Sequence, residues 1–201
     1  GPLNISITVF GEVPPGQALL RHAAQAGDAI YVSGTLGDAR LALEVFRGNT
    51  QVGGDVFERV RARMECPTPR VALGLALRGV AHAAIDVSDG LLGDLGHVLK
   101  RSGVGAHIDT GWVQGSAAVT PDVLGLPWPR RLDCVLAGGD DYELLFTAAV
   151  QDRERIHALA SDIEVPVTRI GRITAESGLR VLDPQGQPIN RRFSSFDHFS
   201  A

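Results

Sequence analysis

Short runs of alternating apolar and polar residues are interspersed with amphipathic stretches along most of the 201-residue chain. Alternation with a period of two predicts half-buried strands, and apolar positions three and four apart predict helices. We expect strands over residues 4–12, 29–33, 82–86, 106–109, 142–148, 165–173 and 179–182. We expect helices over residues 38–46, 57–64, 69–77, 89–101, 132–137 and 153–159. Because strands and helices alternate, the pattern predicts an α+β (α/β layered) domain.

The helix expected over residues 89–101 has the clearest apolar face. Leucine and valine recur at helical spacing from Leu91 onward, and Asp94 falls among the polar positions on the opposite face. Ser88 precedes the helix and is a typical N-cap residue. Asp89 in the first turn is expected to interact favourably with the helix dipole.

The beginning of the chain has a strand pattern with nothing nearby to pair with it. Ile5, Ile7 and Val9 alternate with polar residues until Pro14 and Pro15 interrupt the pattern. The chain also starts with Gly1, and its only methionine is internal, at position 64. We therefore expect residues 1–16 to be the last strand of a missing N-terminal domain plus a linker. Residues 17–201 are expected to form a C-terminal α/β domain.

Composition excludes several functional classes. The net charge is −4 and no long basic run is present, which argues against a nucleic-acid partner. No segment approaches the ~18 consecutive apolar residues of a membrane span. Cys66 and Cys134 fit no metal-ligand spacing, and we interpret them as reduced thiols of a cytoplasmic protein, with a disulfide as the alternative.

The stretch Asp86-Val87-Ser88-Asp89-Gly90 is the strongest candidate for chemistry. It places two carboxylates where a strand is expected to turn into a helix. Mg²⁺ prefers hard oxygen ligands and takes one or two carboxylates from a protein, while water and phosphate supply the rest. The helix start also offers free N–H groups to a phosphate. From these residues alone, a capped strand-to-helix turn without a ligand is the favoured interpretation.

A second acidic stretch, Gly138-Gly139-Asp140-Asp141-Tyr142-Glu143, precedes another expected strand. Glycines allow a backbone to approach a ligand closely, and three carboxylates within four residues repel one another unless solvent or cations compensate them. A solvated turn explains Asp140 and Asp141 equally well. It explains Glu143 less well, because that residue lies within an apolar run.

The remaining candidates are weaker. Residues 33–38 are either an anion-binding nest at a helix start or a simple turn. Arg21 is either a phosphate ligand or an ordinary surface arginine. His82 and His107 flank apolar strands and are expected to pack or to form hydrogen bonds. We find no convincing general base.

Taken together and in order, the motifs resemble those of the bacterial thiamine-monophosphate kinases. The resemblance covers essentially the whole chain. It is carried by these segments: residues 1–14, Gly27–Asp38, Pro67-Thr68-Pro69-Arg70, Asp86–Leu91, Gly138–Phe146 and Phe196-Asp197-His198-Phe199.

That resemblance implies transfer of the γ-phosphoryl group of ATP to thiamine monophosphate, giving thiamine diphosphate. It also implies the superfamily of aminoimidazole ribonucleotide synthetase and selenophosphate synthetase, with a three-layer α/β/α C-terminal domain, a mixed sheet and a homodimer of the full-length enzyme. The alternatives are a superfamily member with another small substrate, and a non-catalytic nucleotide-binding fragment.

By motif match, six residues of this chain acquire expected roles. Asp86 and Asp89 would be magnesium ligands, and Ser88 and Arg21 would contact ATP. Glu143 and Phe196 would contact the thiamine portion. A phosphomonoester is already largely dianionic near pH 7, with a second pKa of ~6, so the absence of a general base agrees with a phosphate acceptor.

Overall fold

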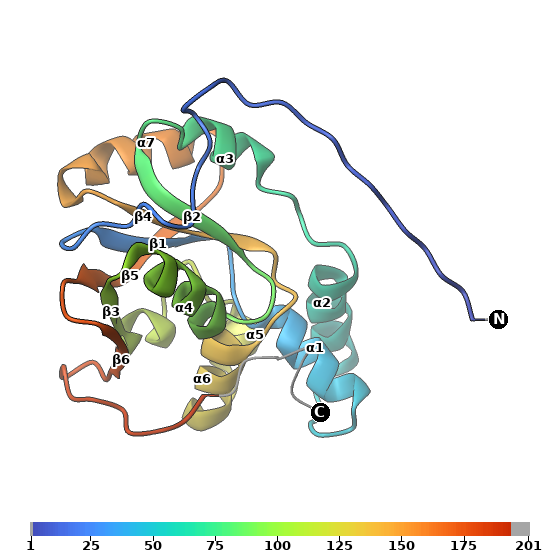
Figure 1. Cartoon of the computed structure of the whole chain (residues 1–201). Helices are drawn as coiled ribbons and strands as arrows, with labels where there is room; N and C mark the ends of the chain where they lie inside the picture. The colour runs from blue at the N-terminus through green and yellow to red at the C-terminus, as the bar shows by residue number, and fades with distance from the viewer. Residues whose placement is uncertain (1, 194–201) are drawn as a thin grey trace.

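The computed structural model describes residues 2–193 and is built around one mixed β-sheet (Figure 1). Among these residues six strands pair in the order β2-β4-β1-β5-β3-β6. Neighbouring strands are antiparallel except for β3 and β6, which are parallel. The strands are β1 Ala29–Ser33, β2 Ala81–Val87, β3 Gly105–Asp109, β4 Glu143–Ala148, β5 Val167–Thr174 and β6 Gly178–Leu182.

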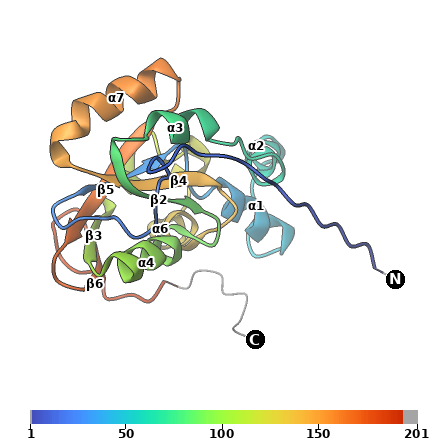
Figure 2. The ribbon, with the colours of Figure 1, turned by 45° about the horizontal axis from the view of Figure 1, so that its top comes forward.

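Helices cover both faces of the sheet, so the molecule has three layers (Figures 1 and 2). Helices α3 and α7 lie on one face, while α4, α5 and α6 lie on the other and α1 and α2 follow at one end. The helices are α1 Asp38–Phe46, α2 Gly54–Glu65, α3 Val71–Ala76, α4 Leu91–Ser102, α5 Pro121–Leu124, α6 Trp128–Ala137 and α7 Arg153–Asp162, with 3₁₀ turns at Thr110–Gln114 and Val150–Asp152. No helix in the described part of the chain is long and apolar enough to cross a membrane.

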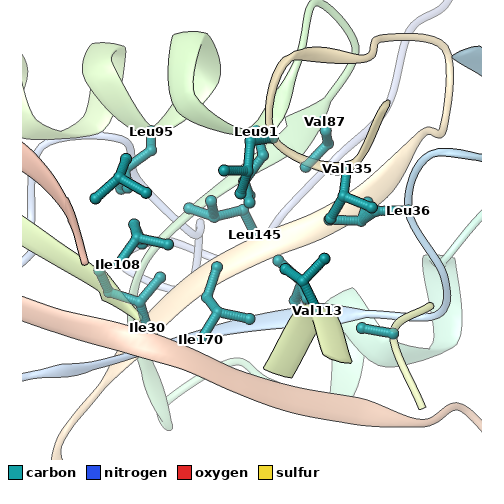
Figure 3. Close-up of a cluster of buried hydrophobic side chains, with 14 of the residues drawn as sticks. Ile30, Leu36, Val87, Leu91, Leu95, Ile108, Val113, Val135, Leu145 and Ile170 are labelled. Atoms are coloured by element: carbon teal, nitrogen blue, oxygen red, sulfur yellow. The ribbon is translucent and has the colours of Figure 1, made fainter. Parts of the chain in front are cut away.

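Each face of the sheet has its own hydrophobic core. The larger core joins Ile30 and Leu145 of the sheet to Leu91 and Leu95 of α4, and all four side chains are fully buried (Figure 3). The smaller core packs Leu73 of α3 and Ile156 of α7 against the opposite face. Successive residues along a strand point to opposite faces, so a sheet covered on both sides needs apolar residues at successive positions. Strand β1, Ala-Ile-Tyr-Val-Ser, is buried throughout for this reason.

The predicted fold class and most of the elements are confirmed. The bounds predicted for β1 and α1 match those of the structure. Residues 110–128, for which we predicted neither helix nor strand, include a 3₁₀ turn and α5, and α6 begins at Trp128 rather than at 132. Both cysteines are free, and burial raises the pKa of Cys134 to about 12, so that side chain is a neutral thiol.

The strand expected at residues 4–12 is not formed. The structure assigns neither helix nor strand there, and the segment runs away from the domain (Figures 1 and 2). The side chains of Ile5, Ile7 and Val9 are 73–85% exposed. A strand requires a partner for its backbone N–H and C=O groups, and this part of the chain pairs with no strand among residues 2–193.

Candidate functional site

The two acidic stretches of the sequence lie side by side at one end of the sheet. The Asp140 N–H donates to the Ser88 carbonyl oxygen at 2.9 Å, and the Tyr142 N–H donates to the Val87 carbonyl oxygen at 2.9 Å. The contact is tight at Gly139, because a Cβ atom there would lie 2.4 Å from the Ser88 carbonyl oxygen. Glycine is therefore required at position 139 to bring the two turns together.

The second turn has an unusual backbone. Asp140 and Tyr142 have φ angles of 66° and 50°, in the left-handed region that favours glycine. Such conformations cost on the order of 1–3 kcal/mol and persist only where surrounding contacts hold them. Here the two hydrogen bonds to the neighbouring turn hold them. The Tyr142 hydroxyl also donates to Asp140 Oδ1 at 3.3 Å.

A pocket of about 480 Å³ opens between these two turns and α1. Its lining includes Ser88 and Asp89 from the first turn, Asp140 from the second, Arg40 from α1 and Arg47 from the C-cap of α1. We refer to this cavity as the mixed-charge pocket. It places two carboxylates and two guanidinium groups around one space.

Asp86 lies just outside this lining. It is the penultimate residue of β2, an edge strand, and its side chain is exposed rather than buried. Burial raises the pKa of the Tyr142 hydroxyl, and the negative charges of Asp140, Asp86 and Asp89 raise it further. All three carboxylates therefore lie close enough to the Tyr142 hydroxyl to affect its pKa, although only Asp89 and Asp140 line the pocket.

The start of α4 differs from the prediction. Helix α4 begins at Leu91, its N-cap is Gly90 with a φ of 125°, and Ser88 and Asp89 belong to the preceding turn. The capping group is the Asp94 carboxylate, whose Oδ2 accepts from the backbone N–H groups of residues 88, 89 and 90 at 3.0–3.2 Å. Asp94 is buried rather than on the polar face, and burial raises its pKa. The N–H groups of residues 88–90, which lead into the helix, are therefore used by the protein itself.

Glu143 is the first residue of β4 and is completely buried. Arg70 binds its carboxylate through two hydrogen bonds of 2.6 Å each, and Arg63 of α2 donates to Oε1 at 2.8 Å. The Ser33 hydroxyl donates to Oε2 at 2.6 Å. A Cβ atom at Gly34, which has a φ of 53°, would lie 2.0 Å from Glu143 Oε1. The sequence therefore accommodates this carboxylate with the adjacent Ser33 and Gly34 and with two arginines, which come from three separate segments.

The possible anion nest at residues 33–38 holds an anionic group from the chain itself. The Gly37 N–H donates to Asp141 Oδ2 at 2.9 Å, and Asp141 is buried rather than in a solvated turn. Burial raises the pKa of Asp141 well above its usual value, and the charge of Asp38 raises it further. Asp38 accepts hydrogen bonds from Thr35 and Thr120, and burial raises its pKa as well. The simpler alternative, a structural strand-to-helix turn, is the one that this geometry supports.

Arg21 does not join these groups in the structure. Arg21 is exposed next to β2, where the preceding residue, Leu20, forms a bridge to Ala83. The Arg21 carbonyl oxygen accepts from the Ser102 hydroxyl at 3.3 Å. Phe196 lies outside the described residues. Of the histidines, His82 forms the expected hydrogen bond, with its Nδ1 2.9 Å from the Asp28 carboxylate oxygens.

The oxygen donors of the site suit a hard divalent cation but do not enclose one. Within residues 2–193, no group of three His, Cys, Asp or Glu side chains could hold a metal ion. Mg²⁺ needs only one or two protein carboxylates when phosphate oxygens and water complete its octahedral shell. Asp86 and Asp89 therefore fit such an ion as a partial ligand set.

Several important residues were not assigned a role from the sequence. Arg63, Arg40, Arg47 and Asp94 each contact or line the site through folding, and the positions of α1 and α2 on the sheet bring the arginines in. Arg70 is part of the Pro67–Arg70 motif, but the neighbouring residues in the sequence do not indicate that it binds Glu143. The Arg70–Glu143 pair spans 73 residues, which no local periodicity can detect.

The sequence of this chain is similar to a known protein family and to curated thiamine-monophosphate kinases. Residues 25–183 match the family model described as AIR synthase related protein, C-terminal domain. The chain is 38% identical over 206 residues to the thiamine-monophosphate kinase of Salmonella typhimurium (strain LT2), covering 100% of this chain and 61% of that protein. The chain thus spans less than two thirds of the length of this curated relative.

Solved structures show the same similarity. The crystal structure of thiamine-monophosphate kinase from Stenotrophomonas maltophilia K279a superposes with a TM-score of 0.77 and 46% identity, over 88% of this chain and 56% of that one. A structure of AaThiL complexed with AMPPCP and TMP superposes with a TM-score of 0.70 and 28% identity, over 90% of this chain and 54% of that one. With a family match over residues 25–183 and the expected three-layer fold, this chain belongs to the AIR synthase related protein family and contains its C-terminal domain.

Proposed function

We propose that this chain is the C-terminal part of a thiamine-monophosphate kinase, which phosphorylates thiamine monophosphate to thiamine diphosphate with ATP and Mg²⁺. The observation that carries the proposal is the meeting of the two acidic turns at the mixed-charge pocket, in a chain that is 46% identical to a thiamine-monophosphate kinase of known structure. The complex of a further relative, AaThiL, with AMPPCP and TMP supports the choice of substrates.

In this proposal the residues position two phosphate groups and compensate their charge. Asp86 and Asp89 would hold Mg²⁺, which when bound neutralises charge that develops on the phosphate oxygens. Ser88 and Arg21 would contact ATP. No side chain is needed to remove a proton from the acceptor, because a phosphomonoester is largely dianionic near neutral pH.

Glu143 and Phe196 would contact the thiamine portion. Glu143 already accepts four hydrogen bonds, two on each oxygen, and a carboxylate has about four acceptor sites. Contact with a substrate would therefore displace one donor. Arg63 is the more exposed of the two arginines, with 23% of its side chain accessible against 15% for Arg70.

The full-length protein would supply what this chain lacks. We propose that residues 1–16 belong to a preceding domain as its last strand, that this domain contributes further acidic ligands, and that the enzyme is a cytoplasmic homodimer acting on small molecules, with no nucleic-acid or membrane partner. The 201-residue chain alone is then expected to have little or no kinase activity. Near-full turnover by the isolated chain would contradict this part of the proposal.

A metal titration tests the proposed site in the full-length enzyme. Asp86→Asn is expected to raise the Mg²⁺ concentration needed for half-maximal formation of thiamine diphosphate and to lower turnover, because one of the two ligands loses its charge. Asp162→Asn, at the end of α7, is the matched control and should leave both quantities unchanged. Unchanged Mg²⁺ dependence in Asp86→Asn would remove that residue from the metal site. Equal binding of thiamine monophosphate and ribose 5-phosphate would remove thiamine as the substrate.

A further inference from the structure

Arg40 of α1 and Arg47, the C-cap residue of α1, line the mixed-charge pocket together with the acidic turns. Arg40 and Arg47 both line the pocket, with Leu43 between them. Their positions, i, i+3 and i+7, place the three side chains on one face of the helix. Helix α1 packs against α2 and α6, so this face is held in a fixed place.

Both guanidinium groups form an ion pair with the same glutamate, Glu44. Arg40 Nε lies 2.9 Å from Glu44 Oε1, and Arg47 Nη1 lies 4.0 Å from the same oxygen. Glu44 Oε1 accepts no hydrogen bond from the described residues, so these ion pairs leave the N–H donors of both guanidinium groups available. The two side chains remain 30% and 50% exposed, so solvent and ligands can reach them.

The charges of the pocket lining are balanced. Asp89 and Asp140 contribute two negative charges, and Arg40 and Arg47 contribute two positive charges. Once a divalent cation is bound by the acidic side, the lining as a whole becomes positive, which suits a phosphate anion. Guanidinium groups bind phosphate in a planar, two-pronged geometry that a point charge cannot reproduce.

We propose that Arg40 and Arg47 bind a phosphate group of the substrate and complete the site opposite Asp89 and Asp140. This inference rests on the proposed function for the identity of the substrate. Whatever the substrate is, the pocket is then a phosphate-binding site with one wall formed by α1 and its C-cap residue. The phosphate belongs either to the nucleotide or to the phosphomonoester acceptor, and both offer the same chemistry to the two arginines.

Inorganic pyrophosphate with Mg²⁺ is the first probe, because it contains only the chemistry that the arginines recognise. Its affinity for the full-length protein is measured by titration calorimetry. Replacement of both arginines, Arg40→Gln with Arg47→Gln, is expected to weaken binding by roughly tenfold per arginine. The matched control is Arg155→Gln on the exposed side of α7, which should bind as the wild-type protein does. Arg40→Lys with Arg47→Lys should restore binding only in part.

Titrations with ATP and with thiamine monophosphate then identify the phosphate. The double glutamine variant should lose affinity for the ligand whose phosphate the arginines hold, with an unchanged melting temperature. If pyrophosphate binding depends on the arginines but neither ATP nor thiamine monophosphate binds the wild-type protein, the inference holds and the proposed function fails. Absence of pyrophosphate binding by the wild-type protein, or equal affinity of the double variant, overturns the inference.

Discussion

Glu143 shows how one buried carboxylate determines the residues around it. Its side chain is completely buried, so the free energy of removing its charge from water must be offset by donors and positive charge. Arg70, Arg63 and Ser33 provide them, and Gly34 leaves the space. Burial raises the pKa of Asp38 and Asp141, and the positive charge of Arg63 partly opposes that rise. A single arginine of α2 thus compensates three acidic residues.

At this scale we predict that Arg70→Ala destabilises the fold by about 2–3 kcal/mol, because it leaves a buried carboxylate with one arginine instead of two. Arg70→Lys should be intermediate, since it keeps the charge and loses the two-pronged geometry. Urea unfolding of the 201-residue chain measures both changes, with the exposed Arg155→Ala as control. A loss below about 1 kcal/mol for Arg70→Ala would mean that Arg63 and solvent compensate Glu143 without it.

At the scale of elements, the site depends on the contact between two turns rather than on either one. The turn before α4 and the turn before β4 are joined by two backbone hydrogen bonds, with Gly139 at the point of closest approach. Asp94 holds the first turn through three N–H groups. The positions of Ser88, Asp89 and Asp140 are therefore fixed by backbone contacts, while their side chains remain at the pocket.

Gly139→Ala tests this junction. The added methyl group would lie 2.4 Å from the Ser88 carbonyl oxygen, so the turns must separate, at a cost of about 1–3 kcal/mol. Gly96→Ala in α4 is the matched control, because its Cβ meets nothing within 4 Å and alanine favours the helix by up to ~1 kcal/mol. Thermal unfolding should therefore show opposite shifts for the two variants. Equal melting temperatures for Gly139→Ala and the unmodified chain would show that the junction can relax freely.

At the scale of the whole molecule, the domain stands apart from its first residues. Leu3, Ile7, Val9 and Phe10 are 82–91% exposed, and both cores are formed by later residues. Contiguous exposed apolar residues with a strand pattern are typical of a segment that pairs with another chain or domain. This agrees with the proposed assignment of residues 1–16 to a preceding domain.

Removal of residues 1–16 is expected to leave the free energy of unfolding within about 0.5 kcal/mol of the value for the 201-residue chain, because exposed side chains contribute little. It should also lower self-association, which sedimentation velocity detects, because an unpaired strand segment is removed. A loss of more than about 1.5 kcal/mol in urea unfolding would place residues 1–16 within the folded domain.

The elements of this protein were predictable because their signals are local. The bounds of α1 and β1, the layered class and the two acidic stretches follow from periodicities and motifs within about ten residues. Helix α4 was predicted to start two residues early, because Ser88 looks like a cap and nothing nearby shows that Asp94 reaches back to take that role.

The partners of the charged residues were decided only by the tertiary structure. Glu143 meets arginines 73 and 80 residues away, and the mixed-charge pocket joins α1 to two turns that lie more than 40 and 90 residues further along the chain. A buried charge requires a counter-charge, and the sequence alone determined that Glu143 would need one. Which arginine supplies it depends on how helices pack on the sheet, and that packing follows from the whole apolar core rather than from any one segment.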